Sequence, residues 1–274
     1  MRHQYLELLK KTLLDIHRLE FGEFKPIHNN PQSWRIKLLS ILNEFLLRKG
    51  YSITKYIPYN LEDRLNGKDW PANADTMIGL KRLDNIQFCI EEILKNNIEG
   101  DLIETGVWRG GAVIWMKGLL KAYENNAKIV WVADSFSGLP KPDSSKYKQD
   151  ANDRHFLYKE LAIPIETVKF NFAKYDLLDD KVKFLAGWFK DTLPNAPIDK
   201  LALLRLDGDM YESTMDALVH LYSKLSIGGY IIIDDWGAVS ACKEAVIDFR
   251  TKFNISEKII PIDWSGVYWK KLRE

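Results

Sequence analysis

Aspartates come at the end of two apolar segments in the C-terminal half of the chain. Asp207 and Asp209 end LLRLDGD, and Asp234 and Asp235 follow GGYIII. If both segments are parallel strands, these carboxylates meet at one edge of a sheet, where they would raise each other's pKa values in the absence of basic neighbours. A hard divalent cation such as Mg²⁺ removes that repulsion, so Asp207, Asp234 and Asp235 are predicted metal ligands. Asp209 is expected instead to cap a helix that begins near Tyr211.

A glycine-containing segment, ETGVWRGG, follows another apolar run and opens a predicted helix. Its GxxxGG spacing is neither a phosphate loop nor the GxGxxG of dinucleotide-binding proteins. The acid before the first glycine, Glu104, suits a ligand with a cationic or hydroxyl-rich portion, and S-adenosylmethionine has both. The alternative is a helix start whose glycines serve only packing. The cofactor-binding residues predicted here are Glu104, Thr105, Gly106, Val107, Gly110 and Gly111.

Three further positions are candidates for the same cofactor. Asp134 and Ser135 end the next apolar run, where an acid commonly accepts hydrogen bonds from ribose hydroxyls. Gly187 and Trp188 end the following one and could form part of an adenine pocket, although a tryptophan that covers the sheet end fits equally well. Met77 could pack over the cofactor or attach the N-terminal helices to the main domain.

Apolar runs alternate with amphipathic stretches after residue 100, which predicts an α/β fold with a parallel sheet. We expect strands at 101–105, 129–134, 182–186, 201–207, 229–234 and 258–262, with the segment GVYWKK as a seventh. Helices are expected at 110–124, 152–175, 211–225 and 238–252, and an earlier one from Thr76 to Asn96. The glycines and acids then fall at the carboxyl ends of the strands, where such sheets bind ligands.

The N-terminal part differs from the rest. Residues 1 to about 50 have helical apolar spacing, interrupted by a loop with Pro26, Asn29, Asn30 and Pro31, and the stretch 51–71 is aromatic and irregular. We therefore divide the chain into an N-terminal extension, 1–75, and a main domain, 76–274. The extension is expected to shape an acceptor site or to form a contact in a homo-oligomer, although its apolar faces could equally pack on their own domain.

A polar, proline-containing stretch from Gly138 to Gln149 predicts a surface loop that acts as a lid over the site. His155 lies beside it and could reach a substrate, but a residue on the surface of a helix is the better interpretation. The net charge of +1 gives no electrostatic reason to expect a nucleic-acid partner. The sequence contains no long, uncharged apolar run, so we expect neither a membrane span nor a signal peptide. The cysteines Cys89 and Cys242 fit a reducing, cytoplasmic location as buried small hydrophobes.

Several segments together resemble a known family. The strings DWPANADTMIGLKRLDNI, ETGVWRGG, DSFSGLP, GWFKDTLP, LRLDGDMYEST and IIIDDW are similar, in order and spacing, to those of the macrocin O-methyltransferase family. Its members are S-adenosylmethionine- and Mg²⁺-dependent sugar O-methyltransferases of macrolide and aminocoumarin biosynthesis. The resemblance implies a Rossmann-like class I methyltransferase fold, with a seven-stranded, mostly parallel sheet, helices on both faces and an N-terminal helical extension.

The resemblance also implies roles for the matching residues. Gly106 would receive the methionine part of the cofactor, Asp134 and Ser135 the ribose, and Gly187 and Trp188 the adenine side. Asp207, Asp234 and Asp235 match the metal-binding aspartates. A hypothesis for the reaction follows: the metal holds two vicinal oxygens of a sugar, and Asp207 accepts the proton of the hydroxyl that is methylated.

Two alternatives remain open. The acceptor could be a catechol-like phenol on the same fold, or the chain could be a non-catalytic protein with a degenerate site. The acids and glycines at the sheet edge argue against degeneration. The sequence leaves open whether a sugar acceptor is a glycoside, a polysaccharide end or a nucleotide sugar.

Overall fold

The computed structural model describes residues 1–18, 23–26 and 34–273. A seven-stranded sheet forms its centre, in the order β5-β4-β3-β6-β7-β9-β8. The strands are β3 (Asp101–Thr105), β4 (Val130–Asp134), β5 (Val182–Ala186), β6 (Leu201–Leu206), β7 (Leu225–Ile233), β8 (Ile260–Pro261) and β9 (Val267–Lys270). β5, β4, β3, β6 and β7 run parallel, and β9 pairs antiparallel with β7 and β8. The predicted seven-stranded, mostly parallel sheet is confirmed.

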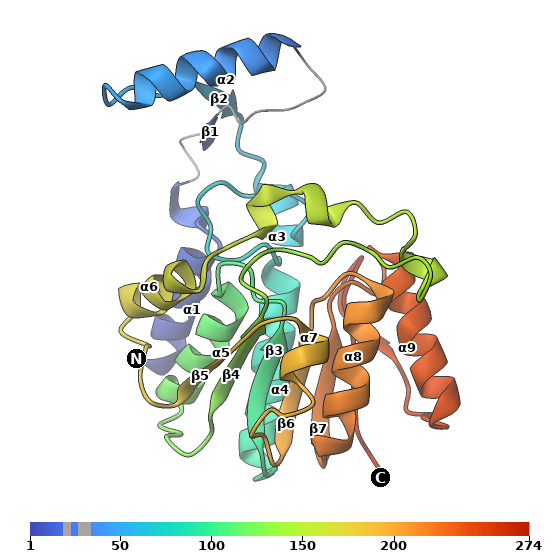
Figure 1. Cartoon of the computed structure of the whole chain (residues 1–274). Coiled ribbons are helices and arrows are strands. Elements are labelled where there is room, and N and C mark those ends of the chain that lie inside the picture. Colours follow the sequence, from blue (N-terminus) through green and yellow to red (C-terminus); the bar gives the residue numbers. More distant parts are fainter. Residues whose placement is uncertain (19–22, 27–33, 274) are drawn as a thin grey trace.

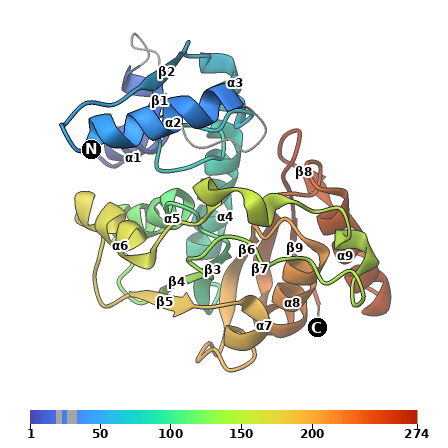
Figure 2. The ribbon, with the colours of Figure 1, turned by 45° about the horizontal axis from the view of Figure 1, so that its top comes forward.

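Helices cover both faces of this sheet (Figure 1, Figure 2). One face carries α4 (Leu80–Lys95), α5 (Gly111–Ala122) and α6 (Ile165–Lys174), and the other carries α8 (Tyr211–Leu221) and α9 (Ser240–Lys252). A short helix, α7 (Phe189–Thr192), follows β5. Because the central strands are buried on both faces, they are continuous apolar runs rather than alternating ones. In β6 all six residues are buried, including one charged residue discussed below.

The N-terminal extension consists of two structurally different parts. α1 (Arg2–Leu13) packs on α5, and its Leu6, Leu9 and Leu13 are buried in the core on that face of the sheet. Gly118 of α5 allows this close approach, since a Cβ there would lie 2.3 Å from Leu9 Cδ2. α2 (Trp34–Leu47) instead lies above the main domain, next to a separate two-stranded sheet of β1 (Glu23–Pro26) and β2 (Thr54–Ile57) (Figure 1).

Two predicted helices are longer than the real ones. The helix expected over 152–175 begins only at Ile165, and two 3₁₀ turns, at His155–Leu157 and Lys159–Leu161, occupy its first part. Pro164 explains the late start, because proline is excluded from a helix interior and favours an extended residue before it. The helix expected over 76–96 begins at Leu80, after Gly79 at its N-cap.

Other differences concern the extension and the surface. β2 and the short helix α3 (Leu61–Asn66) form within the stretch expected to be irregular. Pro26 lies in β1, whereas Asn29, Asn30 and Pro31 of the expected loop lie outside the described residues. Cys89 and Cys242 are buried and unpaired, as expected. In the part of the chain that the structure describes, no helix has the length and apolar character needed to cross a bilayer.

Candidate functional site

The site lies where the order of the strands reverses. From β3 the chain moves outward to β4 and β5, and then returns to β6 on the other side of β3. Such a switch point leaves a crevice outside the carboxyl ends of the strands. Gly106, which follows β3, lies so close to the loop after β6 that a Cβ on it would be 1.6 Å from the carbonyl oxygen of Asp207. The glycine segment and the acidic segment are therefore in direct contact.

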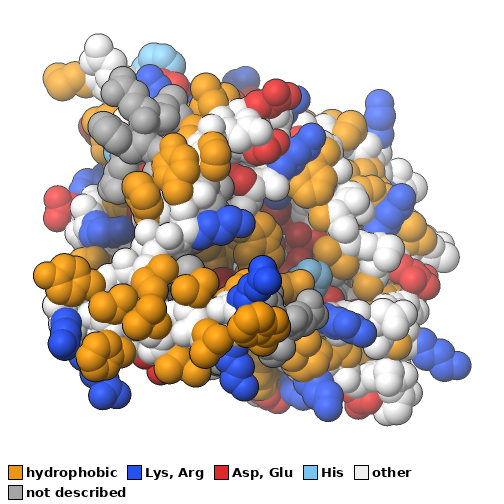
Figure 3. Space-filling view, turned by 90° about the horizontal axis from the view of Figure 1, so that it is seen from above, with side chains coloured by type: hydrophobic (Ala, Val, Ile, Leu, Met, Phe, Trp, Pro, Cys, Tyr) orange, Lys and Arg blue, Asp and Glu red, His pale blue; other side chains and the backbone are white. Residues whose placement is uncertain are grey.

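A cavity of about 390 Å³ opens at this edge. Seen from above, the molecule is hollowed near the centre of this face, and acidic side chains show inside the hollow (Figure 3). The predicted site residues that line the cavity are Met77, Glu104, Gly106, Val107, Asp134, Ser135, Trp188, Asp207, Asp234 and Asp235. The predicted contacts Thr105, Gly110, Gly111 and Gly187 are not among its lining residues.

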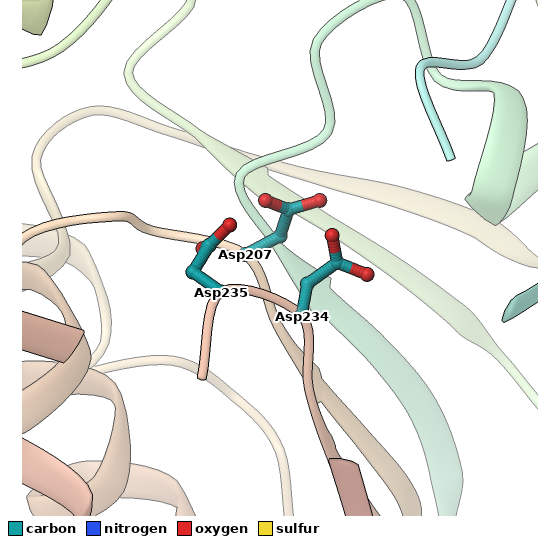
Figure 4. A group of neighbouring side chains, drawn as sticks. All are labelled: Asp207, Asp234 and Asp235. Carbon is teal, nitrogen blue, oxygen red and sulfur yellow. The ribbon is translucent and has the colours of Figure 1, made fainter. Parts of the chain in front are cut away.

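Three carboxylates converge at the floor of this cavity. Asp207 follows β6, and Asp234 and Asp235 follow β7, the neighbouring parallel strand. Their side chains point toward one another (Figure 4), and one oxygen from each lies within 4.8 Å of the others. Hard divalent cations prefer this donor set of carboxylate oxygens. The arrangement fits a Mg²⁺ ion bound by Asp207, Asp234 and Asp235.

Two buried arginines accompany the carboxylates, so this group of acids does have basic neighbours. Arg205, fully buried in β6, pairs with Glu104 and Asp234 and donates to Asp207 Oδ2 at 2.9 Å. Arg82, at the start of α4, pairs with Asp234 and with Asp263. Arg205 had a signal in the sequence, because it is the single charge inside the apolar run LALLRL. Arg82 had none, since the fold brings it from a distant helix.

These arginines reduce the repulsion but do not remove it. Burial raises the pKa of Asp207 to about 7, and the charge of Asp234 adds to the rise, against the opposing effect of Arg205. Burial and the charges of Asp209 and Asp207 raise the pKa of Asp235. The carboxylates therefore exceed the positive charge available from the protein, which leaves room for a bound cation.

Asp209 does not cap α8, contrary to the expectation. The N-cap of α8 is Met210, and the backbone N–H groups of Tyr211 and Glu212 donate to the carboxylate of Asp150, at 2.7 and 2.9 Å. Asp150 belongs to the segment that follows the predicted lid loop, so this contact ties that segment to α8. No local pattern signals it, because Asp150 and Tyr211 are 61 residues apart.

Asp209 itself lines the cavity. Its backbone has a left-handed φ of 55°, and its N–H donates to Asp235 Oδ2 at 3.1 Å. Burial raises the pKa of its carboxyl group to about 6, while His155 opposes the rise. Among the described residues, its carboxylate has no hydrogen-bond or ion-pair partner. A fourth carboxylate thus lies beside the three-acid group without belonging to it.

Glu104 offers an acceptor toward the cofactor side of the cavity. Its Oε1 pairs with Arg205, but its Oε2 is buried and lacks a hydrogen-bond partner within the described residues. Burial raises the pKa of Glu104 to about 8, with Arg205 opposing and the neighbouring aspartates adding to the rise. An unsatisfied buried carboxylate oxygen is costly, so a bound donor is expected there. The ammonium group of an amino-acid ligand such as S-adenosylmethionine has the required chemistry.

The glycines after Gly106 lie close to neighbouring segments. Gly110 has a φ of 88° at the N-cap of α5, and a Cβ on it would lie 2.8 Å from Val168. A Cβ on Gly111 would lie 2.4 Å from the carbonyl oxygen of Asp75. These two glycines therefore let α5 begin close to its neighbours. After the end of β5, Trp188 is one of the residues that line the cavity.

The loop after β4 is held by its own side chains. Asp134 accepts hydrogen bonds from the backbone N–H groups of Val107 and Phe136, both at 2.7 Å. Ser135 Oγ donates to the carbonyl oxygen of Gly138 at 2.6 Å. Asp134 thus connects the glycine segment to the second strand end. Its carboxylate oxygens keep further lone pairs for a ligand hydroxyl.

His155 also faces the cavity and does not lie on the surface of a helix. It begins a 3₁₀ turn, and its Nδ1 lies 2.6 Å from Asp153 Oδ2. The hydrogen bond to Asp153 raises the pKa of the imidazole. Because Nδ1 is occupied, Nε2 is the ring nitrogen left to contact a bound molecule. Neither Asp153 nor this pairing was visible in the sequence beforehand.

Comparisons with known proteins identify relatives over most of the chain. A demethyldecarbamoylnovobiocin O-methyltransferase of Streptomyces niveus is 54% identical over 216 residues, which cover 78% of this chain and 82% of that protein. A mycinamicin III 3''-O-methyltransferase of Micromonospora griseorubida is 51% identical over 213 residues, which cover 77% and 84%. The solved structure of the O-methyltransferase NovP is 44% identical, with a TM-score of 0.84 and full coverage of both chains.

The family assignment rests on the whole chain. Residues 2–271 match the family described as macrocin-O-methyltransferase (TylF), which confirms the resemblance seen in the sequence motifs. The fold and the cavity at its switch point agree with a methyltransferase that uses S-adenosylmethionine. The chain belongs to the macrocin-O-methyltransferase family and is an O-methyltransferase.

Proposed function

We propose that this protein transfers the methyl group of S-adenosylmethionine to a hydroxyl of a sugar, in a reaction that depends on Mg²⁺. The single observation that carries the proposal is the three-acid group of Asp207, Asp234 and Asp235 beside a cavity with an unsatisfied Glu104 oxygen. Relatives named for methylation of glycosylated natural products support a sugar, and in particular a glycoside, as the acceptor. A catechol-like phenol is the competing acceptor.

The cofactor would lie along the ends of β3, β4 and β5. Glu104 Oε2 would accept from its ammonium group, and Gly106 and Val107 would approach its methionine part. Asp134 and Ser135 would face the ribose, and Trp188 and Met77 would cover the adenine side. Thr105, Gly110, Gly111 and Gly187 would hold the backbone of these loops in place. The remaining part of the cavity, next to the lid segment and the N-terminal extension, would receive the acceptor.

The cation would be held by Asp207, Asp234 and Asp235, with Arg205 and Arg82 fixing two of these carboxylates. When bound, Mg²⁺ would lower the pKa of an adjacent acceptor hydroxyl. Holding both reactants in one geometry supplies most of the remaining rate enhancement.

A carboxylate at the end of β6 would accept the proton of the acceptor hydroxyl. Asp207 is the residue predicted from the sequence, but it is also a proposed metal ligand and already accepts from Arg205. Asp209 lines the same cavity and has neither engagement. A bound Mg²⁺ would lower the proton affinity of the carboxylates that hold it, so Asp209, which lies outside the proposed ligand set, is the better acceptor while a metal is bound.

The test of the proposed function combines binding and turnover. Calorimetric titration with S-adenosylhomocysteine should give binding in the micromolar range. Methyl transfer to a panel of glycosides should require Mg²⁺ and cease with EDTA, whereas a simple catechol should not react. Absence of cofactor binding with and without Mg²⁺ would refute the cofactor assignment. Full activity after chelation would refute the metal assignment alone.

Metal binding should make stability depend on pH in a defined direction. Folding raises the pKa of Asp207 to about 7 and of Asp209 to about 6, from about 3.9 in an unfolded chain. These raised pKa values stabilise the metal-free folded protein fully at pH values below the pKa of an aspartate in the unfolded chain. The stabilisation is lost as the pH rises through the pKa values of Asp207 and Asp209 in the folded protein. Protons and Mg²⁺ compete for the carboxylates. The Mg²⁺-induced rise in melting temperature should therefore be small at about pH 5 and large at about pH 8.

The check is differential scanning fluorimetry across this pH range, with and without Mg²⁺. The variant Asp235→Asn should show little Mg²⁺-induced rise at any of these pH values. A rise of equal size at acid and alkaline pH in the wild type would contradict the proposed ligand set.

His155 should position the acceptor. Its free Nε2 would donate to an acceptor oxygen, with Asp153 fixing the orientation of the ring. One hydrogen bond to such a group is worth about 1.5 kcal/mol, or roughly tenfold in affinity. We therefore expect His155→Gln to raise the KM for the acceptor about tenfold, with unchanged affinity for S-adenosylhomocysteine. Unchanged KM, or a loss of cofactor affinity, would remove this role.

A further inference from the structure

The turn between β8 and β9, residues 262–266, packs on the loop that carries two of the proposed metal ligands. The backbone N–H of Gly237 donates to the carbonyl oxygen of Ser265 at 2.8 Å, and Ser265 Oγ donates to the carbonyl oxygen of Asp234 at 2.6 Å. A Cβ on Gly237 would lie 2.2 Å from the carbonyl oxygen of Trp264. The position of Trp264 is therefore fixed by the same contacts that hold the backbone of Asp234.

The side chain of Trp264 is also held in place. Its Nε1 donates to the carbonyl oxygen of Asn66 at 2.8 Å, and the guanidinium group of Arg82 lies 5.7 Å from the centroid of its ring. Arg82 Nε in turn donates to Asp263 Oδ2 at 2.9 Å, and Asp263 Oδ1 accepts from two backbone N–H groups of the turn. The indole is thus preorganised, as a residue that binds a ligand should be.

Despite these contacts, a large part of the indole is open to the cavity. Trp264 is 47% exposed and lines the cavity, whereas Trp115 and Trp269 of the core are fully buried. Nitrogen Nε1 is the single donor of the side chain and is already used. The open part therefore offers a flat apolar surface and no hydrogen bond, which suits a planar apolar group.

The cavity differs in polarity on either side of the three-acid group. Near α8 its lining is charged and includes Lys190 and Glu212. On the side of β7 and β9 its lining includes the apolar side chains of Ala238, Val239 and Trp264. Arg82 contacts both the indole and Asp234, so the indole lies only one side chain away from the proposed metal ligand. The side of β7 and β9 is therefore suited to an apolar group attached to a sugar at the three-acid group.

We propose that Trp264 is a specificity-determining residue, which stacks on a planar apolar aglycone of the glycoside acceptor. The inference rests on the proposed function and identifies the part of the acceptor that lies beyond the methylated sugar. Binding sites for small molecules are lined mainly by apolar and aromatic side chains. Covering roughly 60 Å² of apolar surface corresponds to about tenfold in affinity.

Calorimetry on the full chain, saturated with S-adenosylhomocysteine and Mg²⁺, tests this role without turnover. Two probes are compared for each sugar of the glycoside panel, L-rhamnose among them: the p-nitrophenyl glycoside and the methyl glycoside. The wild type should bind the p-nitrophenyl glycoside of its preferred sugar about tenfold more tightly. Trp264→Ala should abolish this preference, and Trp264→Phe, which keeps an aromatic ring, should retain most of it. The ratio of the two affinities is the readout, because a general disturbance of the metal loop would lower both affinities together.

Phe170→Ala provides the control, because it removes an exposed aromatic ring of α6 that does not line the cavity. It should keep the wild-type ratio, and both alanine variants should bind S-adenosylhomocysteine as the wild type does. A wild type without preference for the p-nitrophenyl glycoside, or a Trp264→Ala variant with the wild-type ratio, would overturn the proposal and leave the proposed function intact. If the wild type bound S-adenosylhomocysteine but none of the glycosides, the sugar acceptor would be refuted together with this inference.

Discussion

Substitution of Asp235 by Asn should lower Mg²⁺ affinity by about 100-fold or more and abolish turnover at ordinary Mg²⁺ concentrations. Loss of a residue that only orients a metal ligand typically costs 10–100-fold, so removal of a charged ligand should cost at least as much. Asp235 is the most informative of the three acids, because it contacts neither Arg205 nor Arg82 in the described structure. The substitution therefore removes a ligand without breaking an arginine pair.

Calorimetry of Mg²⁺ binding measures this effect directly. Asp216→Asn provides the matched control, because Asp216 lines the same cavity but lies outside the three-acid group. It removes the same charge and should retain most of the affinity. If both variants lose affinity equally, the effect is that of the overall negative potential, and the specific ligand assignment fails.

Substitution of Asp209 by Asn should lower kcat by a factor of about 10²–10⁴, the usual contribution of a general base. Mg²⁺ affinity should change far less, since Asp209 lies outside the three-acid group. The Asp207→Asn variant should instead lose both metal affinity and turnover. The two aspartates are two residues apart and line the same cavity. A comparison of the two variants therefore distinguishes the residue that accepts the proton from the residue that binds the metal.

Single-turnover kinetics at saturating Mg²⁺ and cofactor make the measurement independent of product release. Two results together would identify Asp207 as the general base instead. The Asp209→Asn enzyme would keep the wild-type kcat, and the Asp207→Asn enzyme would be inactive even when it is saturated with Mg²⁺. Affinity for S-adenosylhomocysteine should be unchanged by Asp209→Asn, which guards against a folding defect.

The strands and the edge that they form were predictable because their signals are local. Parallel strands buried on both faces are continuous apolar runs, and the residue types that follow them mark the carboxyl ends. The acids Asp207, Asp234 and Asp235 could be grouped from this rule alone. Helix boundaries were less predictable: α6 begins only after Pro164, although the residues before it have helical spacing.

Contacts between segments far apart in the sequence could not be derived in this way. Arg82 pairs with Asp234, which lies 152 residues away in the sequence. Asp150, rather than Asp209 as predicted, accepts hydrogen bonds at the N-terminus of α8. Both depend on how α4 and the lid segment pack across the sheet edge. The periodicity or spacing of residues in one segment does not predict how that segment packs on another, because such packing results from many weak contacts made together.

The sequence by itself determined the α/β class, the approximate positions of the strands along the chain and the identity of the acids at the sheet edge. These properties depend on side-chain period and on residues adjacent in the chain. Only the tertiary structure decided that Arg205 and Arg82 accompany the acids, that Asp209 and His155 face the cavity, and that an indole of the turn between β8 and β9 lines it. Each of these depends on which surfaces meet when the helices close on the sheet, and burial is a property of that assembly rather than of any segment.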